Sequence, residues 1–111
     1  MDTSIFKYFK DIETREIAPG YHSKIIHTAT NTINFIEVDA GSEVPPHQHI
    51  HEQCAFVLEG QFQLTVNGIP QMMEKGMFAI IPPNVPHGGL AITDCKLIDL
   101  FAPPREDFKL L

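Results

Sequence analysis

Short apolar runs separated by turn residues dominate the hydrophobic pattern of this 111-residue chain. Residues 61–66 alternate strictly and place Phe62, Leu64 and Val66 on one face. Asn67-Gly68 follows directly and is a strong signal for a tight hairpin. Apolar or alternating runs predict further strands at residues 24–26, 32–39, 54–58, 71–74, 77–81 and 96–101.

The N-terminal part of the chain fits this strand pattern least well. Residues 4–12 are compatible with one helical turn, in which Ile5, Phe6 and Phe9 would pack inward. No stretch of ten or more residues repeats its apolar positions with the 3.6-residue period of a helix. Several short strands with close turns are typical of an all-β barrel or sandwich, and the pattern alone favours neither.

Composition narrows the classes of function. A length of 111 residues fits one domain, residues 1–111, that can bury a hydrophobic core. A net charge of -6 argues against nucleic acid and anionic membranes as partners, and no run approaches the ~20 apolar residues of a membrane span. Cys54 and Cys95 form no C-x-x-C pair, and no signal peptide is visible. We therefore expect a cytoplasmic protein with both thiols reduced, a disulfide between them being the alternative.

Three of the six histidines lie within five residues, at His47, His49 and His51. They follow Pro45-Pro46, which favours an extended backbone. Side chains at i and i+2 of a strand share one face, so two imidazoles so placed can converge on one metal ion at ~2.0–2.1 Å. Gln53 falls on the same face of an ideal strand, and the spacing leaves open whether it or His51 is the next ligand. The alternative is a set of ordinary surface histidines.

His87 is a candidate ligand from a distant part of the chain. It lies in the segment PPNVPHGG, directly after the predicted strand at residues 77–81. Three prolines stiffen this segment and would hold the histidine in a fixed position at the strand end.

Taken together, these residues resemble the two motifs of the cupin superfamily. The first motif, G-x5-H-x-H-x3-(E/Q)-x6-G, is met over residues 41–60 by Gly41, His47, His49, Gln53 and Gly60. The second motif, G-x5-P-x-(G/N)-x2-H, is met over residues 76–87 by Gly76, Pro82, Asn84 and His87. The resemblance implies a jelly-roll β-barrel with one divalent metal ion (Ni, Zn, Fe or Mn) in its mouth. His47, His49, Gln53 and His87 would be its ligands.

The glutamine at position 53 departs from the glutamate that most cupins carry there. Because Gln53 and three neutral histidines add no charge, the bound ion would keep its full charge and act as a Lewis acid toward an anionic oxygen ligand. The neighbouring Glu52 should point to the other face of the strand. Whether Glu52 or His51 contributes to the site is left open.

Longer runs are similar to the small pectin-degradation cupins, which linearise the unsaturated monouronates released from pectin or alginate. These runs are HQHIHEQ, VLEGQFQLTVNG, IPPNVPHG and LIDLFAPPREDF. The resemblance implies that Asp99 and Arg105 act beside the metal ion, Asp99 by moving the proton of ring opening and Arg105 by holding the carboxylate of the substrate. It also implies a homodimer, in which the N-terminal segment, residues 1–22, would take part.

Both candidate catalytic residues have a structural alternative. Asp99 shares one face of its predicted strand with Leu97 and Phe101, and a carboxylate buried there needs a partner or a function. A salt bridge from Asp99 to Arg105 or Lys96 would meet that need without catalysis.

Arg105 follows Pro103-Pro104, which stiffens its backbone. Its guanidinium group suits bidentate capture of a carboxylate, the group that a uronate offers. The alternative is an ion pair with one of its acidic neighbours, Glu106 or Asp107.

Three functions follow from these expectations. The leading hypothesis is a metal-dependent isomerase or lyase that acts on a small anionic sugar acid. The second is a cupin dioxygenase that uses a redox metal. The third is a non-catalytic, metal-dependent binder of small molecules. No helix-turn-helix pattern accompanies the strands, which argues against a direct transcriptional role.

Overall fold

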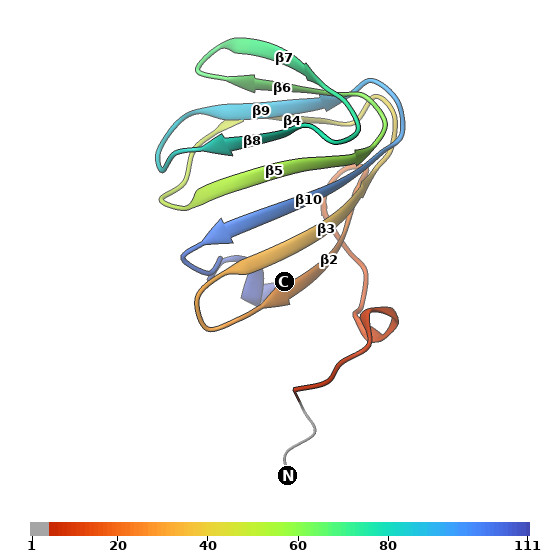
Figure 1. Cartoon of the computed structure of the whole chain (residues 1–111), viewed down its shortest axis with the longest axis vertical. Coiled ribbons are helices and arrows are strands. Elements are labelled where there is room, and N and C mark those ends of the chain that lie inside the picture. The colour runs from red at the N-terminus through yellow and green to blue at the C-terminus, as the bar shows by residue number, and fades with distance from the viewer. Residues whose placement is uncertain (1–4) are drawn as a thin grey trace.

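In the computed structural model, which describes residues 5–111, ten β-strands form two antiparallel sheets (Figure 1). In spatial order, the larger sheet contains β1 (Arg15–Ala18), β2 (Tyr21–His27), β3 (Thr32–Val38), β10 (Cys95–Ala102), β5 (Glu52–Glu59) and β8 (Phe78–Ile81). The smaller sheet contains β4 (Glu43–His47), β9 (His87–Ala91), β6 (Phe62–Val66) and β7 (Ile69–Met73). Two short 3-10 helices, η1 (Phe9–Asp11) and η2 (Phe108–Leu110), flank the strands. This arrangement confirms the predicted all-β jelly-roll fold.

All seven predicted strands are present. Three further strands, β1, β4 and β9, were not predicted. β4 contains two prolines and β9 contains two glycines, so neither has the composition of a typical strand. β4 tolerates its prolines because it lies at the edge of the smaller sheet. In β9, Gly89 packs against Phe62, and an added Cβ atom would lie 2.2 Å from the Phe62 ring. Pairing with β4 and β6 makes β9 extended, whereas in β4 the pairing with β9 adds to the extended preference of Pro45-Pro46.

The hydrophobic core lies between the inner faces of the two sheets. It includes the buried side chains of Tyr21, Ile36, Val38, Val57, Phe62, Leu64, Met73, Ile81, Ala91, Cys95 and Leu97. On β3 the alternate residues Thr32, Asn34, Ile36 and Val38 are all buried, as expected for a strand with one face toward the core. Two of these four side chains are polar, so the inner face is not uniformly apolar.

The prediction of inward packing in the N-terminal segment is wrong for the residues that the structure describes. Ile5 and Phe6 are 71% and 76% exposed, and the helical turn is limited to η1. Figure 1 shows this segment leading away from the sheets before β1 begins. Of these three residues only Phe9 packs on the sheet, with its ring centroid 4.9 Å from that of Phe35 in an edge-to-face contact on the outer face of the larger sheet. The part of the prediction that concerns Ser4 lies outside the described residues.

The two cysteines are free thiols at separate points of the larger sheet. The register partner of Cys54 on β10 is Leu100, five residues along the strand from Cys95. That offset corresponds to about 17 Å, well beyond the reach of a disulfide. The alternative of an intrachain disulfide is therefore wrong. No helix among residues 5–111 is both long and apolar enough to cross a membrane.

Candidate metal centre

Three histidines from distant parts of the chain meet between the two sheets. His47 ends β4, His87 begins β9, and the two residues are register partners in the antiparallel pair. Ring centroids are separated by 4.5 Å for His47 and His87, 4.9 Å for His49 and His87, and 5.9 Å for His47 and His49. One possible ligand atom from each residue lies within 4.8 Å of those of the other two. The histidines therefore form one group with the spacing of a metal site.

The backbone around His49 differs from the ideal strand that the sequence predicts. β4 ends at His47 and β5 begins at Glu52, so His49 lies in the connecting loop. His49 Nδ1 is 3.1 Å from the backbone carbonyl oxygen of His51, which orients the imidazole toward the other two rings. His49 thus joins the group through a loop, and not through the alternation of a single strand.

Backbone carbonyl groups determine which nitrogen of each imidazole faces the group. The acceptors for Nδ1 are Pro45 for His47 (2.9 Å), Val85 for His87 (2.8 Å) and His51 for His49 (3.1 Å). Because a carbonyl oxygen only accepts, Nδ1 carries the proton in each case and Nε2 of the neutral ring keeps its lone pair. Hydrogen bonds of this kind orient the histidine ligands of metal sites.

Burial favours the neutral form of two of these histidines, His49 and His87. It is the main cause that lowers the pKa of His87, and the nearby His47 and Arg105 lower it further, although the hydrogen bond to Val85 opposes the shift. The pKa of His49 is likewise lowered, mainly by burial and then by Arg105. A lowered pKa favours the neutral form, which is the form that binds metal ions.

Gln53 supplies an oxygen beside the imidazoles. Its side chain is buried on β5, and its Oε1 atom lies 3.2 Å from Nε2 of His49. Since His49 carries its proton on Nδ1, its Nε2 atom has a lone pair and no proton. Nε2 of His49 and Oε1 of Gln53 are therefore two acceptor atoms that face each other, and a cation between them would stabilise this arrangement. Nε2 of His87 is also buried and has no hydrogen-bond partner among the described residues. Three imidazole nitrogens and one amide oxygen therefore fit a divalent transition-metal ion.

The structure places the two residues left open by the sequence outside this group. Glu52 is exposed at the start of β5, as expected for a side chain on the face opposite to Gln53. His51 is buried, with its ring 5.2 Å from that of His49 and 6.3 Å from that of Phe101. His51 therefore contacts the ring of His49 but is not one of the three grouped histidines, His47, His49 and His87.

A cavity of about 220 Å³ lies between the sheets and reaches His47 and His87. Most of its wall is apolar, and its polar lining side chains are Tyr21, Asn34, His47, Gln53, His87, Asp99 and Arg105. Cavities that hold drug-sized ligands measure about 300–1,000 Å³. The smaller volume fits one small molecule, such as a single sugar unit, better than an oligomer.

Asp99 projects into this cavity from the middle of β10. Burial raises the pKa of its carboxyl group from 3.8 to about 6, against the opposing effects of a hydrogen bond from Gln53 and the charge of Arg105. Among the described residues no ion pair involves Asp99, because Arg105 pairs with Asp107 and Lys96 lies 3.8 Å from Glu59. The alternative of a structural salt bridge for Asp99 is therefore wrong.

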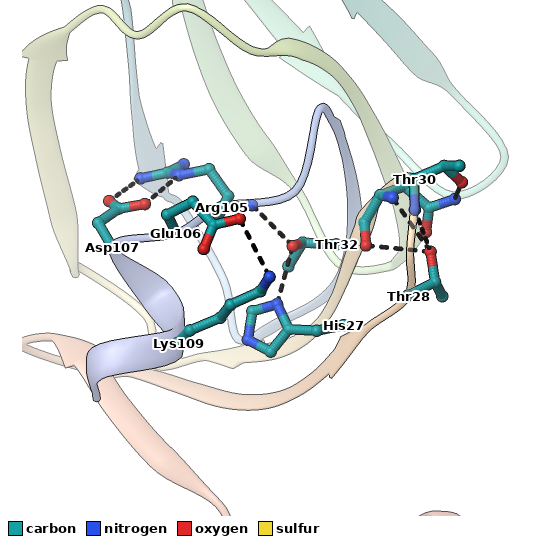
Figure 2. Close-up of polar contacts among 9 residues, drawn as sticks. His27, Thr28, Thr30, Thr32, Arg105, Glu106, Asp107 and Lys109 are labelled. Carbon is teal, nitrogen blue, oxygen red and sulfur yellow. Dashed lines mark hydrogen bonds and ion pairs between the residues drawn. The ribbon is translucent and has the colours of Figure 1, made fainter.

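Arg105 is held in place by several contacts at once (Figure 2). Its Nε and Nη2 atoms donate to the two carboxylate oxygens of Asp107 at 2.9 and 2.7 Å, and its backbone N–H donates to Thr32 Oγ1 at 2.8 Å. Its guanidinium carbon Cζ also lies over two aromatic rings, 4.7 Å from the ring centroid of Phe101 and 3.9 Å from that of Phe108. The predicted alternative of a pair with Asp107 is thus realised.

The pair with Asp107 does not remove Arg105 from the cavity. The guanidinium group has five N–H donors, and Asp107 engages only Nε and Nη2. Arg105 remains among the residues that line the cavity. Its other acidic neighbour, Glu106, instead accepts from Lys109 at 3.0 Å.

Asn34, which was not among the residues predicted from the sequence, lines the same cavity. Asn34 is the register partner of Asp99 on the neighbouring strand β3, and it is fully buried. A signal was available, because Asn34 falls on the inner face of the run TINFIEV between Thr32 and Ile36. A polar residue at an inward position of a strand is a candidate for a site.

Comparisons with known proteins agree with this geometry. The chain is 32% identical over 107 residues to the pectin degradation protein KdgF of Dickeya dadantii (strain 3937), a match that covers 92% of this chain and 97% of that protein. It is 29% identical over 107 residues to the H2HPP isomerase of Bacillus subtilis, covering 93% of this chain and 45% of that protein. The chain therefore spans less than half the length of this second relative.

Similarity extends to a solved structure and to a family model. The structure of KdgF from Halomonas sp. superposes with a TM-score of 0.85 at 30% identity, covering 93% of this chain and 98% of that chain. Residues 34–101 match the family model described as the cupin domain, which includes both histidine motifs. With this fold, these motifs and these relatives, the chain belongs to the cupin family.

Proposed function

We propose that this protein is a metal-dependent isomerase or lyase that opens the ring of an unsaturated uronate, a small anionic sugar acid. The observation that carries the proposal is one cavity that brings together a metal-binding donor set, a carboxyl group with a pKa of about 6 and an arginine. The similarities to a pectin degradation protein and to an isomerase support the same class of substrate and reaction.

His47, His49, His87 and Gln53 would hold one divalent ion, either Ni, Zn, Fe or Mn. The bound ion would supply Lewis-acid polarisation of a substrate oxygen. The carbonyl groups that accept from Nδ1 of the three histidines keep the rings oriented before the ion arrives.

Asp99 would carry the proton of the reaction. As a carboxylate it would accept the proton of the anomeric hydroxyl while the bond between the anomeric carbon and the ring oxygen breaks. The ring oxygen then leaves as part of an enolate, and Asp99 would return the proton to the alkene carbon, which yields an open-chain ketone. No atom is gained or lost. A pKa of about 6 suits a group that accepts and returns a proton near neutral pH.

Arg105 would bind the carboxylate of the uronate. Its side chain is only 11% exposed, so an ion pair formed there would be weakly screened by solvent. Asp107 and the two phenylalanine rings hold the guanidinium group in one orientation. A preorganised guanidinium loses little entropy when it binds a carboxylate.

The test uses freshly prepared unsaturated galacturonate and follows the loss of its double-bond absorbance. Metal-loaded protein should exceed the spontaneous rate, whereas metal-stripped protein should not. Asp99→Asn should abolish turnover with unchanged metal content, and Asp39→Asn, which changes an exposed carboxylate, should be the active control. Full activity of Asp99→Asn would refute the role of Asp99. No acceleration by fully loaded wild-type protein would refute the uronate as substrate.

The same donor set also accommodates iron and other redox metals, so a dioxygenase is the second candidate function. Oxygen uptake by the iron-loaded protein with a phenolic or thiol substrate would separate it from the isomerase. Saturable binding of such molecules with neither uptake nor turnover would support a non-catalytic binder.

We also propose that two copies of the chain pair through the outer face of the larger sheet. An outer apolar face is formed there by Phe35, Phe56, Leu58, Phe78, Ile80, Ile98 and Leu100. Phe78 and Ile80 are 58% and 63% exposed, and the exposed N-terminal segment adjoins this face through Phe9 and Phe35. A continuous apolar patch of this kind is typical of a protein–protein interface.

A further inference from the structure

A strip of inward-facing polar side chains, two buried and one half-buried, crosses the inner face of the larger sheet. Ser23 on β2, Asn34 on β3 and Asp99 on β10 all face inward on neighbouring strands. Asn34 is the direct register partner of Asp99, and Ser23 lies diagonally from Asn34 because its own partner is Ile36. The strip continues to the metal centre, since Gln53 on the adjacent strand β5 lines the same cavity as Asp99.

The Asn34 side chain has no hydrogen-bond partner among the described residues. Both Nδ2 and Oδ1 are buried and unpaired, and the residue as a whole is 0% exposed. A buried amide without partners destabilises a fold, so such groups are uncommon in structural positions. An apolar residue at this inward position would cost the fold less.

A cavity distinguishes Asn34 from Ser23. Ser23 Oγ is also buried and unpaired, yet only Asn34 lines the cavity that contains Asp99 and Arg105. A ligand in this cavity can therefore reach the neighbourhood of Asn34 and not that of Ser23. Ser23 is thus a matched control for an unpaired polar group outside the site.

We propose that Asn34 is a substrate-binding residue that accepts from and donates to a hydroxyl group of the sugar acid. An amide offers one acceptor and two donors, which matches a hydroxyl group that both donates and accepts. Arg105 would bind the carboxylate, and Asp99 would lie between these two contacts and the metal centre. This inference rests on the proposed function and narrows its substrate to a hydroxylated acid with a second polar group near β3.

Kinetics with unsaturated galacturonate provide the first test. Asn34→Leu should lower kcat/KM by about tenfold or more, chiefly through KM, because one desolvated hydrogen-bonding group is lost. Metal content should not change, and the melting temperature should hold or rise because an unpaired amide is removed. Ser23→Ala should keep kcat/KM within about twofold of wild type. A value for Asn34→Leu within about twofold of wild type, or a loss confined to kcat, would overturn the proposal.

A second measurement uses the wild-type protein and so does not depend on the folding of a variant. The assigned side-chain NH₂ signal of Asn34 is followed by NMR in zinc-loaded protein as D-galacturonate is added. A saturable shift of this signal supports the contact, and an unchanged signal at saturation overturns it. If the wild-type enzyme shows no turnover but the Asn34 signal shifts, only the proposed reaction fails. If neither occurs, both proposals fail.

Discussion

His47 and His87 are register partners across β4 and β9, with ring centroids 4.5 Å apart, although forty residues separate them in the chain. Antiparallel pairing therefore brings together the two histidine motifs of the sequence. The same pairing sets the distance between the imidazoles, because strand spacing is fixed by backbone hydrogen bonds. The geometry of the candidate metal centre is thus a property of the smaller sheet and of the loop that carries His49.

Metal binding should depend on the histidine group and should stabilise the fold. His87→Ala should lose the bound ion, as measured by elemental analysis after gel filtration, whereas His22→Ala should keep it because His22 is exposed and pairs with Asp39. Chelation of the wild-type protein should lower its stability by about 2.7 kcal/mol if the free ion had been held at a hundred times its Kd. Equal metal content in wild type and His87→Ala would contradict the assignment.

Gln53→Glu should bind the metal ion more tightly and turn over more slowly. An anionic ligand should slow the loss of the ion to a chelator by about tenfold, because it offsets the charge of the ion. Turnover should fall, since the ion polarises its ligands less and the new carboxylate lies against Asp99.

Glu52→Gln is the control for this change, because it alters one carboxylate on the exposed face of the same strand. The Glu52→Gln variant should lose its ion to a chelator at the wild-type rate and should turn over substrate at the wild-type rate. A Gln53→Glu variant that loses the ion as fast as the wild type would exclude Gln53 as a ligand.

The stability of the metal-free protein should depend on pH through Asp99. Burial raises the pKa of this carboxyl group to about 6 in the folded state, so folding favours the protonated form. The contribution is fully present below about pH 4 and is lost as pH rises through about 6. A shift of this size corresponds to about 3 kcal/mol at most.

Asp99→Asn should remove this loss, because the amide does not titrate. Urea denaturation in the presence of a chelator, at pH 4.5 and pH 7.5, measures the effect. The free energy of unfolding of the variant, relative to that of the wild type, should be higher at pH 7.5 than at pH 4.5. If the free energies of unfolding of variant and wild type differ by the same amount at both pH values, Asp99 is not desolvated in the folded protein.

The ion pair between Asp107 and Arg105 should orient the guanidinium group for substrate (Figure 2). Asp107→Asn removes the charge but keeps the shape, and kcat/KM should fall by about three- to tenfold, mainly through KM. Glu106→Gln is the control, because within residues 5–111 Glu106 pairs only with Lys109 at the surface. Equal KM values for the two variants would show that Arg105 is oriented without Asp107.

Disruption of the outer apolar face should convert a dimer into a monomer. Ile80→Asp introduces a charge on the edge strand β8, where Ile80 is one of the most exposed apolar residues of this face, and light scattering should then report half the wild-type mass. Ile69→Asp on β7 is the matched control, because Ile69 is 71% exposed but lies on the smaller sheet. A monomeric wild-type protein, or an Ile80→Asp variant of unchanged mass, would refute the interface.

Local patterns in the sequence were sufficient to predict much of this fold. Alternation of apolar residues identified strands such as β6, and the Asn67-Gly68 turn predicted its hairpin with β7. Motif spacing selected His47, His49, Gln53 and His87 as candidate ligands. These signals are readable because strand alternation and turn conformation depend on neighbouring residues alone.

Contacts between distant segments account for what the sequence did not predict. β9 is extended despite its glycines because it pairs with β4 and β6. His49 reaches the site from a loop, next to His87 of a distant strand. Asn34 becomes notable only because β3 lies beside β10, which places it opposite Asp99. Register across a sheet and the burial of a polar side chain arise only when the whole chain is folded, because both require partners that are far away in the sequence.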